Sequence, residues 1–96
     1  MNQNDIVTVL TPVGEMIGRL ESNDNDVVVL QDAKTLMQTQ QGMGFAPSIS
    51  MSASPNVKSV EIQKAQVVAI VPTAREIADA WIQATSGIVV GSTGLS

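Results

Sequence analysis

Residues 9–32 decide the fold of this chain, and they read VLTPVGEMIGRLESNDNDVVVLQD. A first turn is predicted at Thr11–Gly14, because proline presets φ at the second position and glycine suits the fourth. A second turn is predicted at Asn23–Asp26, where Asn and Asp bond their own backbone and tolerate positive φ. Residues that favour extended backbone surround these turns, in the segments Ile6–Leu10, Glu15–Glu21 and Val27–Leu30. Short connections join antiparallel neighbours, so this stretch predicts a three-stranded meander.

Gly18 lies in the middle of the second predicted strand. A glycine inside a strand usually marks a sharp bend or the close approach of another backbone. Met16 and Leu20 flank it at a spacing of two, so all three residues share one face of the strand. A strand that bends at glycine, with apolar residues inside the bend, indicates a small and strongly curved barrel.

Two more strands are predicted further along the chain. Val57–Ile62 is the fourth strand, and Val67–Val71 is the fifth, which ends at Pro72. The polar corner Gln63–Gln66 joins them. Together with the meander, these strands predict a mainly β fold, a small five-stranded, strongly bent antiparallel open barrel over about residues 6–71.

The two segments between the third and fourth strands are less regular. Residues 31–37 either continue the third strand through a bulge or form a short helical turn. Gln38–Asn56 reads QTQQGMGFAPSISMSASPN, and its richness in Gln, Ser, Gly and Pro predicts a long variable loop. Its Met and Phe side chains also suit an adaptable contact surface for a protein partner or a base.

A C-terminal helix is predicted over residues 73–86. Thr73 as N-cap and Glu76 three residues later fit a capping box. One face carries apolar residues at helical spacing, namely Ala74, Ile77, Ala78, Trp81 and Ile82. We interpret Trp81 as packing against the barrel or a neighbouring subunit, with a stacking platform for nucleic acid as the alternative. The tail, residues 88–96, is expected to be flexible or to add a short strand.

Composition excludes several classes of function. The chain has 96 residues, which suits a single domain over residues 1–96, and it contains neither Cys nor His. It therefore lacks the commonest general base and the commonest metal ligand, and we expect no enzyme, no metal and no cofactor. The net charge of −4 excludes a strongly basic nucleic-acid binder. No segment has the pattern of a signal peptide or a membrane span, so a soluble, cytoplasmic protein is expected.

Gly18-Arg19-Leu20, followed by Asp24 and by Val27–Leu30, resembles the first sequence motif of the Sm and Sm-like (Lsm) proteins. That motif has a glycine, a leucine two residues on, an aspartate four beyond, and an apolar strand that contains an asparagine. Val28 stands at the position of this asparagine, which in the family helps to hold RNA. The replacement indicates a divergent branch of the family, such as a phage-encoded one.

A second resemblance lies at Ile62–Val67, which reads IQKAQV and is similar to the second Sm motif, Ile-Arg-Gly-x-Asn-Val. Here Gln63 stands for arginine, Lys64 for glycine and Gln66 for asparagine. The apolar frame of the motif is kept, while the residues that read RNA are replaced by other hydrogen-bonding types.

The resemblance implies a homo-oligomeric ring in which the fourth strand of one subunit pairs with the fifth strand of the next. Strand composition independently favours self-association, because the uncharged segment Val67–Val71 leaves an apolar edge in a monomer, although a dimer would also cover it. In Sm-like rings, the turn after the second strand and the corner after the fourth line the pore. The nucleic-acid-binding residues that the resemblance implies are Asn23, Asp24, Asn25, Gln63, Lys64 and Gln66.

RNA or single-stranded DNA is the ligand expected from these residues, in nucleic-acid processing or as a chaperone. Amide groups can bond base edges, and Lys64 can meet a phosphate. The structural alternatives are that Asn23–Asp26 only makes a tight turn, in which Asp24 caps backbone groups, and that Lys64 only occupies a solvated corner. The alternative function is a non-catalytic assembly module, which keeps the fold without the nucleic acid and contacts a protein partner through Gln38–Asn56.

Overall fold

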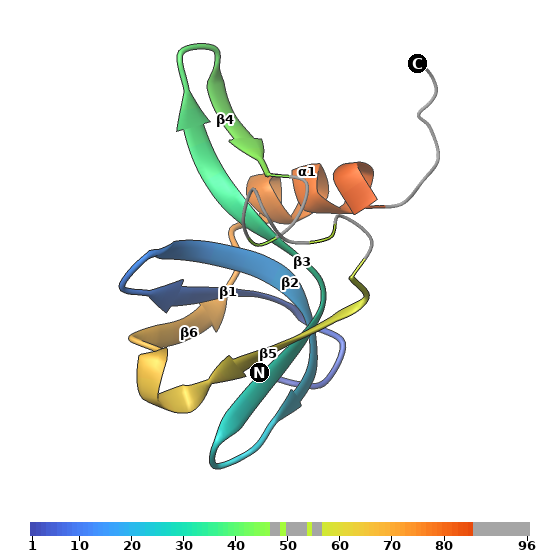
Figure 1. The fold of residues 1–96 in the computed structure, drawn as a ribbon. Coiled ribbons are helices and arrows are strands. Elements are labelled where there is room, and N and C mark those ends of the chain that lie inside the picture. The colour runs from blue at the N-terminus through green and yellow to red at the C-terminus, as the bar shows by residue number, and fades with distance from the viewer. Residues whose placement is uncertain (47–48, 50–53, 55–56, 86–96) are drawn as a thin grey trace.

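The computed structural model describes residues 1–46, 49, 54 and 57–85, which form an antiparallel β-sheet followed by a helix (Figure 1). The strands in these residues are β1 (Ile6–Thr11), β2 (Gly14–Asn23), β3 (Val27–Thr39), β4 (Gly42–Phe45), β5 (Ser59–Gln63) and β6 (Ala69–Pro72). A short 3-10 helix, η1 (Lys64–Gln66), joins β5 to β6, and the helix α1 spans Arg75–Thr85. The mainly β class and the C-terminal helix are therefore confirmed, whereas the predicted number of five strands is wrong, because β4 forms a sixth within the segment predicted to be a loop.

All strand pairs of the sheet are antiparallel, and the predicted meander β1–β2–β3 lies at its centre. β6 pairs with the outer edge of β1, so the last strand returns to lie beside the first. β3 is long enough to pair with two strands along one edge, with β5 along Val27–Gln31 and with β4 along Leu36–Thr39. The sheet is not closed, because β5 and β6 do not pair with each other in the described part of the chain.

Gly18 lies in β2, close against the backbone of β3. A Cβ atom on this residue would lie 3.0 Å from the carbonyl oxygen of Gln31 and 3.2 Å from the Cα atom of Ala33. The predicted close approach of another backbone is therefore confirmed. Figure 1 shows that β2 and β3 both curve along their length.

A bulge in β3 lies beside this glycine. The register between β2 and β3 shifts between Ile17 and Arg19, where β3 supplies one residue more than β2. Asp32 lies in this part of β3 and has a φ of +52°, which Asp tolerates better than most residues. Bulges bend the strand and increase its twist, so the bulge adds to the curvature near Gly18. The bulge predicted within residues 31–37 is confirmed, and the alternative of a helical turn is wrong.

Apolar side chains are buried on both faces of the sheet. The inner, concave face holds the main core, which consists of Val7, Val9, Leu20, Val28, Leu30, Ala33, Val60 and Ile62. Because side chains alternate along a strand, Ile17 points to the opposite face from its neighbour Met16, which packs on that core. Ile17 is buried on this second face, where α1 contacts β2.

Trp81 attaches α1 to the sheet. Its side chain is 2 % exposed, and its Nε1 donates a hydrogen bond to the carbonyl oxygen of Asp32 at 3.0 Å. The guanidinium of Arg19 lies 5.4 Å from the centroid of the ring, which is the geometry of a cation–π contact. The predicted packing of Trp81 against the sheet is confirmed, and a ring this deeply buried does not serve as a stacking platform.

The segment expected to be a loop, Gln38–Asn56, begins with regular structure. Its first two residues end β3, and β4 pairs back on β3 as a hairpin. The hydroxyl of Thr39 stabilises the turn, since it donates to the carbonyl oxygen of Gly42 at 2.8 Å and accepts from the N–H of Gln41 at 3.2 Å. Most of the remainder, after Ala46, lies outside the described residues.

The C-terminal elements begin and end slightly away from their predicted positions. Ala78 N–H donates to the carbonyl oxygen of Ala74 at 2.9 Å, so Ala74 holds the N-cap position that was predicted for Thr73. The hydroxyl of Thr73 instead forms a hydrogen bond of 2.9 Å with that of Thr8. β6 extends through Pro72, which an edge strand tolerates. The predicted tail, residues 88–96, lies outside the described residues.

Candidate nucleic-acid interface

Two short connections meet at one end of the sheet, and they carry the six residues predicted to bind nucleic acid. The turn Asn23–Asp26 joins β2 to β3, and the corner Gln63–Gln66 joins β5 to β6. The β3–β5 ladder ends with Val27 opposite Gln63, and the N–H of Lys64 donates to the carbonyl oxygen of Asp26 at 2.8 Å. The structure therefore brings the turn and the corner side by side, although they are about forty residues apart in the sequence.

The turn is exposed, and one backbone hydrogen bond closes it. The N–H of Asp24 donates to the carbonyl oxygen of Val27 at 2.9 Å, which closes the turn through the backbone. The side chains of Asn23, Asp24 and Asn25 are exposed, and together with Asp26 they line an open hollow of about 580 Å³. Their amides and carboxylates are therefore available to a ligand.

Backbone hydrogen bonds on both sides fix the corner. The N–H of Lys64 is held by Asp26, and its carbonyl oxygen accepts from the N–H of Val67 at 3.0 Å. The side chain of Lys64 is partly buried, whereas those of Gln63 and Gln66 are exposed. The backbone of the corner is thus held in place without the help of these three side chains.

In the part of the chain that the structure describes, the predicted residues of the turn and the two Gln residues of the corner line different depressions. Gln63 and Gln66 line a second, largely apolar groove of about 260 Å³, which runs along β5. Apart from these two Gln residues, this groove is lined by Thr11, Pro12, Val13, Met16, Ile49, Val60, Glu61 and Ile62. Sequence reasoning did not predict it; the signal for it is Val13, an apolar residue placed in a turn and 92 % exposed.

The charge of the site limits what it can bind. Lys64 is the only cation among the residues of the turn and the corner, whereas Asp24 and Asp26 are both anions. The turn and the corner of each chain therefore carry a net charge of −1. Phosphate affinity comes mainly from clustered cations, so binding at this site depends on amide contacts and on Lys64 together. Neither connection contains an aromatic residue that could stack on a base.

Val28, at the position where the resembled family has an RNA-holding asparagine, has no exposed surface. Its side chain belongs to the core, and it pairs with Ile62 of β5. A ligand at this end of the sheet therefore has no access to residue 28, which leaves the turn and corner residues as its contacts.

Within residues 1–46, 49, 54 and 57–85, no three carboxylates or other ligating side chains gather to hold a metal ion. Nor does any helix in this part of the chain have the length and apolar character needed to cross a membrane.

No protein-family model matches the sequence, and no curated protein matches it either. The class of the protein must therefore be inferred from its strand order and from the residues of the turn and the corner.

Proposed function

We propose that this chain is a divergent Sm-like protein, which assembles into a homo-oligomeric ring and binds RNA or single-stranded DNA through the turn and the corner. The observation that carries the proposal is the contact between these two connections, made by the 2.8 Å hydrogen bond from Lys64 N–H to Asp26. Both motifs that resemble the Sm family thus meet at one end of a curved, open five-strand unit formed by β1, β2, β3, β5 and β6. The curvature of β2 and β3 supports the proposal, because a bent barrel is what the resemblance implies.

One edge of β5 and one edge of β6 have no partner strand among the described residues, and these edges support self-association. β6 pairs only with β1 among the described strands, and Val71 within it is 42 % exposed. Val68, just before β6, is 70 % exposed. Apolar edges of this kind favour pairing with another chain, and repeating one edge-to-edge contact around a rotation axis satisfies every edge. Joining β5 of one copy to β6 of the next therefore explains why both edges are left open.

A ring multiplies the weak site of a single copy. Each subunit would contribute one Lys64 and the amides of Asn23, Asn25, Gln63 and Gln66 to the rim of the pore. The carboxylates of the turn would repeat as well, so we expect binding that is weak and strongly dependent on salt. A single strand suits this site better than a duplex, because amides can bond the exposed edges of unpaired bases.

Fluorescence anisotropy with uridine-rich RNA, adenine-rich RNA and DNA oligomers at low salt tests this function. Lys64→Ala is expected to weaken binding several-fold. The association constant should also fall less steeply with salt, so that the log–log slope is shallower by about 0.7 for each phosphate that is no longer neutralised. Lys58→Ala is the matched control, because Lys58 has the same charge but precedes β5 at its opposite end. No binding by the wild-type chain to any of the three oligomers would contradict the proposal.

A second candidate function is a non-catalytic assembly module that keeps the fold without nucleic acid. The net charge of −4 and the two exposed carboxylates of the turn favour it, together with exposed methionines on the β3–β4 hairpin. Met37 is 42 % and Met43 63 % exposed. A pull-down that compares the wild type with Met37→Ser/Met43→Ser tests this candidate, and partners retained unchanged by the variant would count against it.

A further inference from the structure

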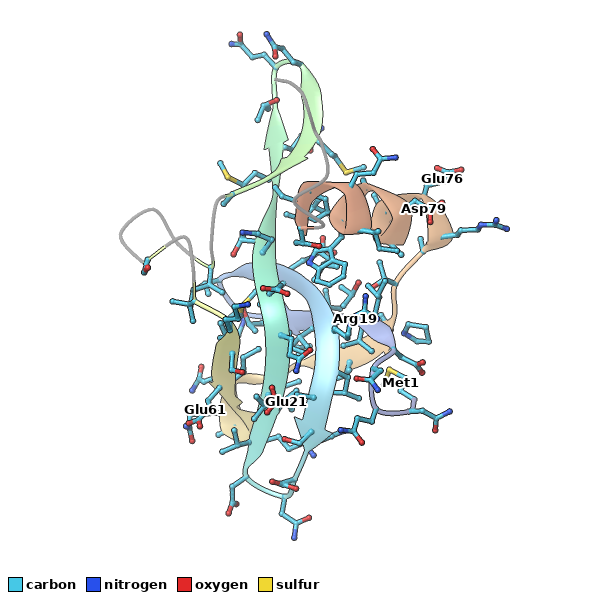
Figure 2. All side chains as sticks on the ribbon, turned by 90° about the vertical axis from the view of Figure 1, so that its right-hand side faces the viewer. Met1, Arg19, Glu21, Glu61, Glu76 and Asp79 are labelled. Carbon is cyan, nitrogen blue, oxygen red and sulfur yellow. The ribbon has the colours of Figure 1, made fainter. Side chains whose placement is uncertain are left out.

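The hairpin formed by β3 and β4 extends away from the rest of the sheet (Figures 1 and 2). From Thr35 to Ala46 it reads TLMQTQQGMGFA and contains no charged residue, in a chain whose net charge is −4. Its outer strand, β4, pairs only with β3 among the described strands. It is therefore an uncharged sheet edge on an acidic protein, and it belongs to neither of the edges used in the proposed ring.

The register of the hairpin shows which backbone groups face outward. The N–H of Ala46 donates to the carbonyl oxygen of Thr35 at 2.9 Å. In an antiparallel ladder, hydrogen-bonded and non-hydrogen-bonded pairs alternate, so Gly44 bonds to β3 while Met43 and Phe45 do not. The N–H and C=O groups of Met43 and Phe45 consequently point away from β3, and no other described residue hydrogen-bonds to them.

Within β4 itself, no side chain is of a kind that protects a sheet edge. Gly44 separates the two outward-facing residues, and a Cβ atom placed on it would meet no atom within 4 Å. Exposed edge strands normally carry a charge, a proline or a bulge that prevents pairing with another chain. β4, with the sequence GMGF and a regular register, has none of these features.

We propose that β4 pairs antiparallel with β4 of a second copy of this chain, about a two-fold axis that passes beside Gly44. In this register Met43 lies opposite Phe45 of the second copy, and Gly44 lies opposite its own counterpart. In each of the two Met43–Phe45 pairs, the outward-facing N–H and C=O groups can exchange two backbone hydrogen bonds. The two central glycines form a non-hydrogen-bonded pair. The strand is complementary to itself, as a two-fold interface requires.

Charge and side-chain chemistry identify a second copy as the occupant of this edge. Two copies that each carry −4 repel one another over most of their surfaces, and the hairpin lets them meet where neither has a charge. Met43 and Phe45 lie on the same face of the hairpin, opposite Gln38 and Leu36 respectively. Pairing places each thioether beside the aromatic ring of the other copy, which is a favourable contact.

Disulfide trapping tests the register directly, because the natural chain contains no cysteine. Across a non-hydrogen-bonded pair the Cα atoms lie about 4.5 Å apart, which is within the range of roughly 4.4–6.8 Å that a disulfide spans. Gly44→Cys is therefore expected to give a covalent dimer under mild oxidation, which a reductant reverses. Gln40→Cys, at the tip of the hairpin, is the control. In the proposed dimer its two thiols would be roughly 25 Å apart, which is too far for a disulfide.

The two variants are compared at equal concentration on non-reducing gels. Nearly complete dimerisation of Gly44→Cys, with little dimerisation of Gln40→Cys, is the expected result. Equal and slow cross-linking of both variants would overturn the proposal, since it would show only random collision of exposed thiols.

Sedimentation equilibrium provides a second test that does not depend on the ring. Met43→Lys places a charge on the pairing edge, and Gln41→Lys places the same charge in the turn outside β4. Because the hairpin joins assemblies in pairs, Met43→Lys is expected to halve the mass of the wild-type particle, whether that particle is a dimer or a pair of rings. Gln41→Lys should keep the wild-type mass, and an unchanged mass in Met43→Lys would overturn the proposal.

Discussion

The substitution Gly18→Ala tests the packing of β2 against β3 most sharply. An alanine Cβ at this position would lie 3.0 Å from the carbonyl oxygen of Gln31, 3.1 Å from the Cβ of Leu30 and 3.2 Å from the Cα of Ala33. Non-bonded carbon atoms prefer separations of about 3.5–4.0 Å, so the three neighbours must each move by a few tenths of an ångström. Each of the three atoms is part of the backbone or fixed directly to it, and so the β3 bulge itself must shift.

The size of the effect follows from two opposing contributions. Forcing an extra methyl group into a packed site typically costs about 1–3 kcal/mol. Replacing a glycine within a strand by alanine returns roughly 0.5–1 kcal/mol of backbone entropy. The midpoints of these two ranges leave a net loss of about 1 kcal/mol, which lowers the Tm of a domain of this size by roughly 4–8 °C.

Thermal unfolding followed by circular dichroism measures this loss, at one fixed protein concentration because self-association raises Tm. Gly44→Ala is the matched control, since a Cβ at residue 44 meets no atom of the same chain within 4 Å, and both variants are compared in the Met43→Lys background, which removes the hairpin contact. The control is expected to unfold at the temperature of the Met43→Lys parent or slightly above it. A Gly18→Ala protein as stable as that parent would refute the close approach of the two strands.

Three further perturbations test other parts of the fold and the site. Trp81→Ala should cost about 3–5 kcal/mol in urea unfolding. Trp81→Phe should cost about 1–2 kcal/mol, because it loses the hydrogen bond to Asp32, and a Trp81→Phe protein as stable as the wild type would contradict a role for that bond. Val28→Asn, which introduces the asparagine of the resembled family, should lower the free energy of unfolding by about 1–3 kcal/mol, because residue 28 is buried. It should not raise the affinity for RNA measured by fluorescence anisotropy, and tighter binding would show that the residue is accessible. Thr8→Val and Thr73→Val should each cost about 1 kcal/mol, and the double variant should lose less than their sum; strict additivity would argue against their hydroxyl contact.

The central strands could be predicted from sequence because their signals are local. The turn at Thr11–Gly14 has proline and glycine at the positions that a turn requires, and the structure gives Gly14 a φ of +147°. Gly18 indicated a backbone contact in the same local way, because a glycine inside a strand leaves space for another backbone to approach. The partner of that contact was not predictable, because the bulge at Asp32 arises from register between two strands.

The hairpin was missed because its stability comes from pairing and not from its own composition. Gln40 and Gln41 are not typical residues of a two-residue hairpin turn, which usually contains Asn-Gly or Asp-Gly. The Thr39 hydroxyl provides the turn's extra hydrogen bonds, a role that no residue pattern indicates. The helix start shifted for a comparable reason, since Thr73 forms its hydrogen bond with Thr8, 65 residues away in the sequence.

The proximity of the turn and the corner was predictable, whereas the arrangement of their side chains was not. The resemblance of both motifs to the Sm family predicted that the turn and the corner belong together, and the Lys64–Asp26 backbone hydrogen bond joins them. Five of the six residues are divided between two depressions, and this division depends on side-chain directions that the sequence does not specify. The burial of Val28 was likewise visible only in three dimensions.

The native mass of the Met43→Lys variant is the most direct measurement of the ring, because this variant removes the hairpin contact and leaves β5 and β6 unchanged. Sedimentation equilibrium is expected to give a closed particle of more than two copies of the 10.1 kDa chain, with a mass that does not change over a wide range of concentrations. A stable species at the mass of a single chain would contradict the proposed ring, because the open edges of β5 and β6 would then have no partner.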